Sequence, residues 1–331
     1  MSWLELKLQI PRDHAAELEI LLDELGAVAI TMMDAEDKPL FEPGPGETPL
    51  WDNLIVTGLF PEDTDAAALQ AAIASAWSPR TLPAMETSKL ADQNWVRAWL
   101  DDFKPMRFGH RLWVCPSWWM AGKDGNATSD WSPSPQDAET WETRNHDLLG
   151  EMQQPGNAIM LLDPGMAFGT GTHPTTSLCL QWLDAKVMRA ETLVDYGCGS
   201  GILGIAALLL GARRVYGVDN DPQALIATAD NCAKNQLDPA SFPVFLPEAF
   251  NKAIKSGSIE PVDGMMANIL AGTLIELAEV LALQVKKGGW ILLSGILREQ
   301  ADAVVSAYAP WFTDCIVTAE QDWVRISAIR Y

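Results

Sequence analysis

The first part of the chain alternates between strand-like and helix-like patterns of hydrophobic residues. Hydrophobic side chains recur at every second position in Trp3–Leu8, which is typical of a strand with one buried face. An amphipathic helical pattern runs from Pro11 to Leu25, and Gly26 ends it. A strand, a second strand, a helix and a last strand are then expected at residues 28–33, 54–60, 65–77 and 85–90. This β-α-β-β-α-β order predicts a small ferredoxin-like α+β domain over residues 1–90.

The second half of the chain has a different and more regular pattern. Short apolar runs alternate with helical stretches from residue 157 onward, and we expect strands at residues 192–196, 214–218, 243–246, 262–268 and 290–294. Such an alternation is typical of an α/β domain with a parallel sheet covered on both faces. We therefore expect a doubly wound, Rossmann-like domain over residues 157–331.

Two segments of lower regularity lie between these domains. Residues 91–117 contain an aromatic-rich stretch, 94–105, that we interpret as a linker helix followed by connecting strands. Residues 118–156 are rich in Gly, Ser, Pro, Asp and Asn and have few aliphatic side chains. Such composition predicts a polar, exposed insertion.

The charge of the chain limits its partners. The net charge of −21 should repel phosphate backbones, so we expect no direct binding to nucleic acid and attraction toward a basic protein. The alternative is the general acidity of many cytosolic proteins. The longest apolar run, Ile202–Leu210, is much shorter than the roughly 20 residues of a membrane span, and no secretion signal is apparent. The five scattered cysteines lack metal-ligand spacing, so we expect reduced thiols in the cytoplasm and no metal site. We also expect a monomer.

The strongest motif is a glycine turn that follows a predicted strand. Asp195-Tyr-Gly197-Cys-Gly199-Ser-Gly201 is separated by one helix length from Asp219, at the end of the next strand. An acid about 20 residues after such a turn is placed by a βαβ unit to bind the ribose of a nucleoside-like ligand. The turn matches both the G-x-G-x-x-G pattern of dinucleotide sites and the acid-x-G-x-G-x-G pattern of S-adenosylmethionine sites.

Asp195 favours the second of these cofactors. A carboxylate beside the turn would repel a pyrophosphate at the helix N-terminus, whereas it would attract the ammonium group of a methionine moiety. Asp219 is the expected ribose ligand, since a carboxylate can accept hydrogen bonds from both vicinal hydroxyls. Its alternative role is an N-cap, for which Asp221 is better placed because Pro222 follows it.

Two further segments carry candidate chemistry. Asn268 ends a predicted strand, where its side-chain oxygen could accept a hydrogen bond from an amine, although an Asn there is more often a turn former. Residues 162–177 combine glycines and threonines before a helix, as in a loop that closes over a ligand or in a capped connector. Within it, Phe168 could form an apolar wall. His173 could act as a general base, but a structural role is favoured.

These segments together resemble the PrmA family, the methyltransferases of the eleventh large-subunit ribosomal protein. The resemblance includes Phe41-Glu-Pro-Gly-Pro-Gly-Glu, Phe103-Lys-Pro-Met-Arg-Phe-Gly, the 163–176 segment, the glycine turn and Asn268-Ile-Leu. It implies a class I methyltransferase fold, recognition of the ribosomal protein by residues 1–90, and methylation of amines up to three times each. It also implies contacts with the cofactor at Thr176, Gly197, Asp219 and Asn268.

We therefore expect an S-adenosylmethionine-dependent protein N-methyltransferase that modifies lysine and N-terminal amines of a basic large-subunit ribosomal protein. Asn268 is the expected catalytic residue, and Asp195 and Gly199 are added to the cofactor site because of their place in the glycine turn. A nicotinamide oxidoreductase and a ribosome-assembly module without turnover remain as alternatives.

Overall fold

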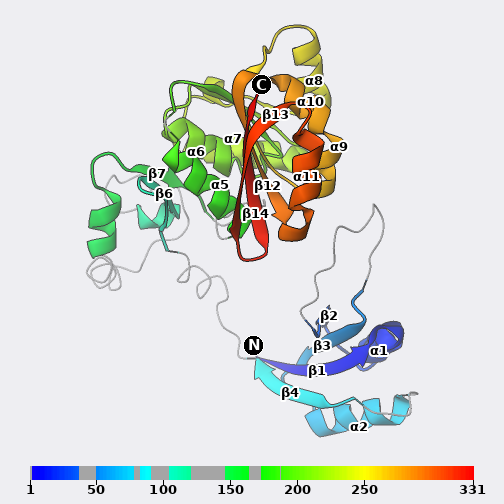
Figure 1. The fold of residues 1–331 in the computed structure, drawn as a ribbon. Helices are drawn as coiled ribbons and strands as arrows, with labels where there is room; N and C mark the ends of the chain where they lie inside the picture. Colours follow the sequence, from blue (N-terminus) through cyan, green and yellow to red (C-terminus); the bar gives the residue numbers. More distant parts are fainter. Residues whose placement is uncertain are drawn as a thin grey trace. The chain divides into compact units, whose positions relative to one another are not determined.

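The computed structural model describes residues 2–36, 50–77, 83–90, 104–120, 146–163, 173–186 and 188–331. The chain divides into two compact units, Met1–Asp102 and Phe103–Tyr331 (Figure 1). Most of the predicted linker helix, the loop at 164–172 with Phe168, and residues 121–145 of the predicted insertion lie outside the described residues.

The smaller unit has the predicted ferredoxin-like fold. Its elements are β1 (Trp3–Pro11), α1 (Ala15–Glu24), β2 (Ala29–Asp34), β3 (Asn53–Pro61), α2 (Ala66–Ala76) and β4 (Met85–Leu90). The strands form an antiparallel sheet in the order β2-β3-β1-β4. Alternate residues of β1 are buried, and they pack with Leu18 and Leu22 of α1 and Ile73 of α2 into one core. The period-2 pattern of β1 therefore arises because only one face of the sheet is covered by helices.

The larger unit is built on a seven-stranded sheet in the order β10-β9-β8-β11-β12-β14-β13. Its strands are β8 (Thr192–Tyr196), β9 (Arg214–Val218), β10 (Val244–Phe245), β11 (Val262–Asn268), β12 (Val285–Leu297), β13 (Phe312–Glu320) and β14 (Trp323–Arg330). The five strands expected from the sequence are confirmed. The expectation of a wholly parallel sheet is wrong, because β14 runs antiparallel to both β12 and β13. The short connection between β13 and β14 forms a hairpin, which can join only antiparallel strands.

Helices cover both faces of this sheet, as a doubly wound fold requires (Figure 1). The helices are α5 (Pro174–Ala185), α6 (Ile202–Leu209), α7 (Pro222–Lys234), α8 (Pro247–Lys255), α9 (Ala271–Glu276), α10 (Ala278–Gln284) and α11 (Ala301–Tyr308). Buried side chains of α5, α6 and α7 form one core with the sheet, and those of α8 to α11 form a second. The strands of such a sheet have both faces buried, and this explains their continuous apolar runs.

A separate three-stranded sheet lies at the start of the larger unit. It consists of β5 (Met106–Phe108), β6 (Leu112–Cys115) and β7 (Ala158–Leu161), and a helix over residues 146–152 precedes β7. Trp118, Trp119 and Met152 are buried, so these residues of the tract expected to be exposed pack into the unit instead. Sequence periodicity misses them because the polar residues around them mask their pattern.

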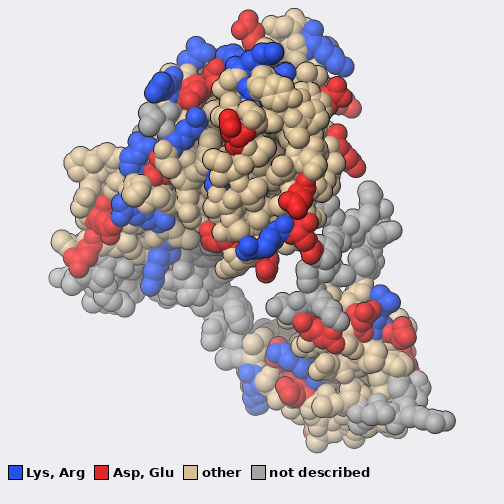
Figure 2. Space-filling model, viewed as in Figure 1, with Lys and Arg blue, Asp and Glu red and all other residues tan. Residues whose placement is uncertain are grey.

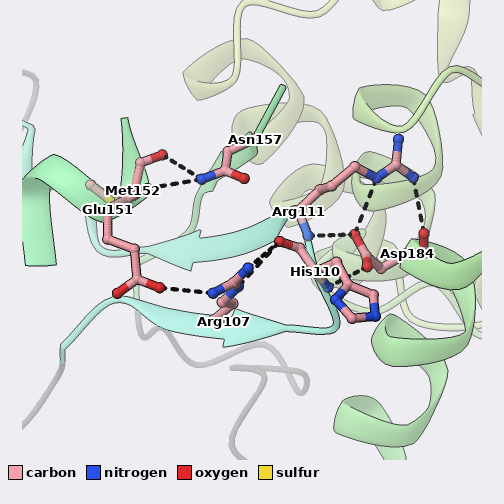
Figure 3. Close-up of polar contacts among 7 residues, drawn as sticks. All are labelled: Arg107, His110, Arg111, Glu151, Met152, Asn157 and Asp184. Carbon is pink, nitrogen blue, oxygen red and sulfur yellow. Dashed lines mark hydrogen bonds and ion pairs between the residues drawn. The ribbon is translucent and has the colours of Figure 1, made fainter. Parts of the chain in front are cut away.

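Asp184, at the end of α5, joins this small sheet to the larger one (Figure 3). Its carboxylate is buried and accepts hydrogen bonds from the backbone N–H groups of His110, Arg111 and Leu112, at 2.5, 3.0 and 3.0 Å. The guanidinium of Arg111 also donates to the Asp184 carbonyl at 2.9 Å. Because three N–H groups of the β5–β6 turn depend on one carboxylate, this residue fixes the small sheet against α5.

We predict that Asp184→Asn lowers the free energy of unfolding of the protein by about 1–3 kcal/mol, since an amide cannot accept all three hydrogen bonds. The control is Glu151→Gln, which breaks the exposed 2.7 Å ion pair with Arg107 seen in the same view and should cost less than about 1 kcal/mol. Urea unfolding of both variants measures the difference. Equal losses would contradict the role of Asp184.

Candidate functional site

The candidate site is a cavity at the carboxyl ends of the parallel strands. Its volume is about 530 Å³, within the range of small-molecule sites, and its lining includes Tyr196 at the end of β8, Gly197 and Asp219 just after β8 and β9, and Asn268 at the end of β11. Gly295 of β12 and Trp323 of β14 complete that part of the wall. A doubly wound sheet places its ligand sites at this edge, where neighbouring loops diverge.

Ile269 brings three strand ends into close contact. It lies between Gly197 and Gly295, which have φ values of +76° and +82°. A Cβ atom at Gly197 would come within 2.2 Å of the Ile269 Cγ2 atom, and one at Gly295 within 2.3 Å of the Ile269 carbonyl oxygen. Both positions therefore require glycine for conformation and for space. The preceding residue, Asn268, is held at the cavity wall by this packing.

Asp219 meets the glycine turn as the spacing predicts. Its Oδ2 accepts a hydrogen bond from Gly199 N at 2.9 Å, and its Oδ1 accepts one from Asp221 N at 3.0 Å. Each carboxylate oxygen can still accept a second hydrogen bond toward the cavity. Asp221 caps α7 through Gln223 N at 2.9 Å, with Pro222 in the first turn. The predicted role of Asp221 as the helix cap is therefore confirmed.

Asn268 and Thr176 lie together although 92 residues separate them in the chain. The Asn268 amide nitrogen donates to the Thr176 hydroxyl at 3.3 Å. This hydrogen bond fixes the amide and leaves its oxygen as the acceptor for a ligand. Thr176 itself is fully buried, and its neighbours His173 and Thr175 line the cavity instead. Thr176 therefore acts on the cavity through Asn268.

Asp195 lies behind the cavity wall rather than on it. Its side chain is 1% exposed and accepts a hydrogen bond from Gly204 N, in the first turn of α6, at 2.9 Å. Burial, with a smaller effect from the nearby charge of Asp219, raises its pKa to about 7 against the opposing effect of the Gly204 hydrogen bond. The carboxyl group can therefore change its charge near neutral pH.

His173 has a structural position at the start of α5. Its Nδ1 lies 2.7 Å from the Thr175 hydroxyl, and its ring packs edge-on against Trp323 with 4.8 Å between ring centroids. Burial lowers its pKa, which favours the neutral ring. These contacts agree with the favoured structural role.

The sequence analysis missed several residues of the cavity wall. Gly295 follows a predicted strand as Gly197 does, and this similarity could have indicated it. Trp323 offered no such signal, because it enters the cavity from a hairpin that the parallel-sheet prediction did not include. Tyr196, Ile269 and Leu277 look like ordinary core residues in the sequence, yet they provide apolar walls.

The cavity suits S-adenosylmethionine. Asp219 can accept hydrogen bonds from a ribose diol, and Gly197 lines the cavity with backbone alone. Pro247, Leu270 and Leu277 give the wall the apolar surface that an adenine and a thioether prefer.

Comparison with known proteins identifies the family. The model of the family described as "Ribosomal protein L11 methyltransferase (PrmA)" matches residues 2–130 and 126–330. The chain belongs to this family. Proteins named ribosomal protein L11 methyltransferase from Azotobacter vinelandii and Cellvibrio japonicus are 46% and 44% identical over 330 residues, covering all of this chain and 100% and 99% of their own lengths.

A solved structure has the same fold. The ribosomal protein L11 methylase of Lactobacillus delbrueckii subsp. bulgaricus aligns with 69% of this chain and 99% of its own, at 24% identity and a TM-score of 0.52. As a member of the PrmA family, the chain is a class I methyltransferase that uses S-adenosylmethionine. The alternative of a nicotinamide oxidoreductase is therefore wrong.

The described residues of this PrmA-family chain contain neither a metal-binding cluster nor a membrane-spanning helix. Among those residues, no group of three or more His, Cys, Asp or Glu side chains is arranged to hold a metal ion. Within the same residues, no helix combines the length and the apolar character needed to cross a bilayer.

We predict that Asp219→Asn weakens S-adenosylmethionine binding about ten- to a hundredfold, because it removes one charge-assisted acceptor worth about 1.5–3 kcal/mol. Asp230→Asn, at an exposed position of α7, makes the same change in charge and should leave the affinity unaltered. Isothermal titration calorimetry measures both. Unchanged affinity in Asp219→Asn would refute its role as a ribose ligand.

Proposed function

We propose that this enzyme transfers methyl groups from S-adenosylmethionine to lysine and N-terminal amines of ribosomal protein L11, as a monomer in the cytoplasm. The observation that carries the proposal is the position of Asn268 on the wall of the cavity, with its amide fixed by Thr176. The names of the full-length relatives support the identity of the protein substrate.

The reaction requires the protein to position the amine, because the methyl group of the cofactor is already activated. A methyl group on a sulfonium is already electrophilic, so the attacking amine needs only to be neutral and in line with it. The Asn268 side-chain oxygen can accept an N–H from that amine, and this hydrogen bond directs the nitrogen lone pair toward the methyl group. Asn268 is then a catalytic residue that orients the nucleophile.

The apolar lining supports the same step. Ile269, Leu277 and Trp323 give the cavity an apolar lining, and a neutral amine is favoured over an ammonium ion in such surroundings. The amine can lose its proton to solvent before it enters, so the proposal needs no general base. His173, with its lowered pKa and its contact with Thr175, serves to shape the start of α5.

Two expectations concern how the enzyme recognises its substrate protein. Residues 1–90 are the segment that the family resemblance assigns to recognition of L11. The net charge of −21 favours the approach of a basic protein, because opposite charges raise the rate of encounter.

Intact-mass spectrometry of purified L11 tests the proposed function. After incubation with enzyme and S-adenosylmethionine, we expect mass increments in multiples of one methyl group, and peptide mapping should place them on lysine side chains and the N-terminus. An unchanged mass, with cofactor binding confirmed by calorimetry, would exclude L11 as the substrate.

We predict that Asn268→Ala lowers kcat for L11 methylation about a hundredfold, since the amine loses its orienting acceptor. Thr176→Val keeps the size of the side chain but removes the hydroxyl that fixes Asn268, so a smaller loss of kcat is expected. Cofactor affinity of the Thr176 variant, measured by calorimetry, should be unchanged. Full kcat in Asn268→Ala would contradict the proposed orientation of the amine.

We also predict that S-adenosylmethionine binds more tightly as the pH rises toward about 7, the pKa of Asp195, and that the affinity levels off above this value. Below this pH the acid is neutral and attracts the cofactor ammonium weakly, whereas above it the carboxylate attracts the ammonium fully. Asp195→Asn should bind the cofactor with an affinity that is flat over the same range. The same pH dependence in both proteins, measured by calorimetry, would exclude Asp195 as its source.

A further inference from the structure

A group of cations lies at the edge of the seven-stranded sheet opposite the cavity. We call it the basic rim, and its members are Lys186, Arg189, Arg213, Arg214, Lys286 and Lys287. They flank the amino ends of β9, β8 and β12, and Asp263 of β11 lies among them. Figure 2 shows Lys and Arg side chains gathered along the upper part of the larger unit, on the side where Figure 1 places the chain's C-terminus.

The basic rim is unusual for so acidic a chain. The protein has 44 Asp and Glu against 23 Lys and Arg, yet in the hollow of the rim two acids, Glu191 and Asp263, accompany four cations. Both acids are already engaged: Asp263 pairs with Lys286 at 2.7 Å and accepts from Thr192 N at 2.8 Å, and Glu191 accepts from Arg189 N at 2.5 Å. The local charge is therefore positive, in contrast to the chain as a whole.

Three cations of the rim have no carboxylate partner. Among the described residues, Arg189, Arg214 and Lys287 are exposed, and no Asp or Glu oxygen lies within 4.0 Å of their charged groups. Lys186, by contrast, is held over the rings of Trp182 and Trp290 at 5.5 and 5.1 Å. The rim thus combines one cation held over two aromatic rings and 4.0 Å from a Glu191 oxygen with three exposed cations whose charged groups have no carboxylate partner among the described residues.

The shape of the rim suits an extended anion. A hollow of about 420 Å³ is lined by Lys186, Arg189, Lys286 and Lys287. The cations extend over four adjacent strands, from β9 to β12, and three strand spacings correspond to about 14 Å. A single small anion would use only part of this length, and it would need enclosed donors rather than exposed, flexible ones. A chain of phosphates would use the whole row.

We propose that the basic rim binds the phosphate backbone of a nucleic acid. This inference modifies the expectation from net charge, because binding depends on the local arrangement of cations as well as on their sum. The contacts are to phosphates, so the affinity should be independent of base sequence and strongly dependent on salt. The rim and the cavity occupy opposite edges of one sheet, so both can be occupied at once. The proposal does not rest on L11 being the methylation substrate.

The test is fluorescence anisotropy of a short labelled single-stranded RNA with the full-length protein, between about 50 and 200 mM salt. The triple variant Arg189→Gln, Arg214→Gln and Lys287→Gln should bind at least about tenfold more weakly at low salt. Its slope of log affinity against log salt should be smaller by about 2, at 0.7 for each lost phosphate contact. The control triple variant Lys7→Gln, Arg12→Gln and Lys89→Gln removes the same charge from exposed positions of the smaller unit and should retain most of the binding.

Three results would overturn the proposal: no RNA binding by the wild-type protein at low salt, equal losses in the two triple variants, or equal competition by anionic lipid vesicles at matched charge. Methylation of free L11 by the rim variant should equal that of the wild type, because the rim is remote from the cavity. The binding assay contains no S-adenosylmethionine or L11, so failure of the proposed methylation and failure of RNA binding are separate outcomes.

Discussion

The contact of Ile269 with two glycine turns is the constraint on which the site depends. Gly197 follows β8 and Gly295 lies near the end of β12, the two strands on either side of β11, and neither position has room for a Cβ atom. This packing brings the carboxyl ends of three strands together, so that Asn268, immediately before Ile269, lies on the cavity wall. The position of Asn268 on the cavity wall follows from this close contact, and the Thr176 hydroxyl then fixes its amide.

The two edges of the seven-stranded sheet carry different features. Its carboxyl edge carries the cavity with Asp219 and Asn268, while its amino edge carries the basic rim. Asp184 performs a third task at the end of α5, where one buried carboxylate satisfies three backbone N–H groups and attaches the small sheet. Buried acids therefore have different roles in this unit: Asp184 organises a turn, whereas Asp195 lies beside the cofactor site with a raised pKa.

The sequence predicted most of the fold, because its elements have clear local signals. The alternation in β1, the cap at Asp221 and the spacing from the glycine turn to Asp219 each depend on residues close in the chain. The hydrogen bond between Asn268 and Thr176 joins residues 92 apart, so only the family resemblance brought the two into one site. Trp323 was missed because the antiparallel hairpin was not expected. The basic rim was missed because net charge sums over the whole chain and contains no information on position.

The most direct test of this account is a crystal structure of the protein with S-adenosylhomocysteine and a peptide from the N-terminus of L11. We expect the ribose to bind Asp219 and the nucleoside to lie against the backbone of Gly197. The peptide amine should lie within hydrogen-bond distance of the Asn268 side-chain oxygen. A nucleoside bound outside this cavity, or an amine that contacts other residues while Asn268 remains turned away, would contradict the account.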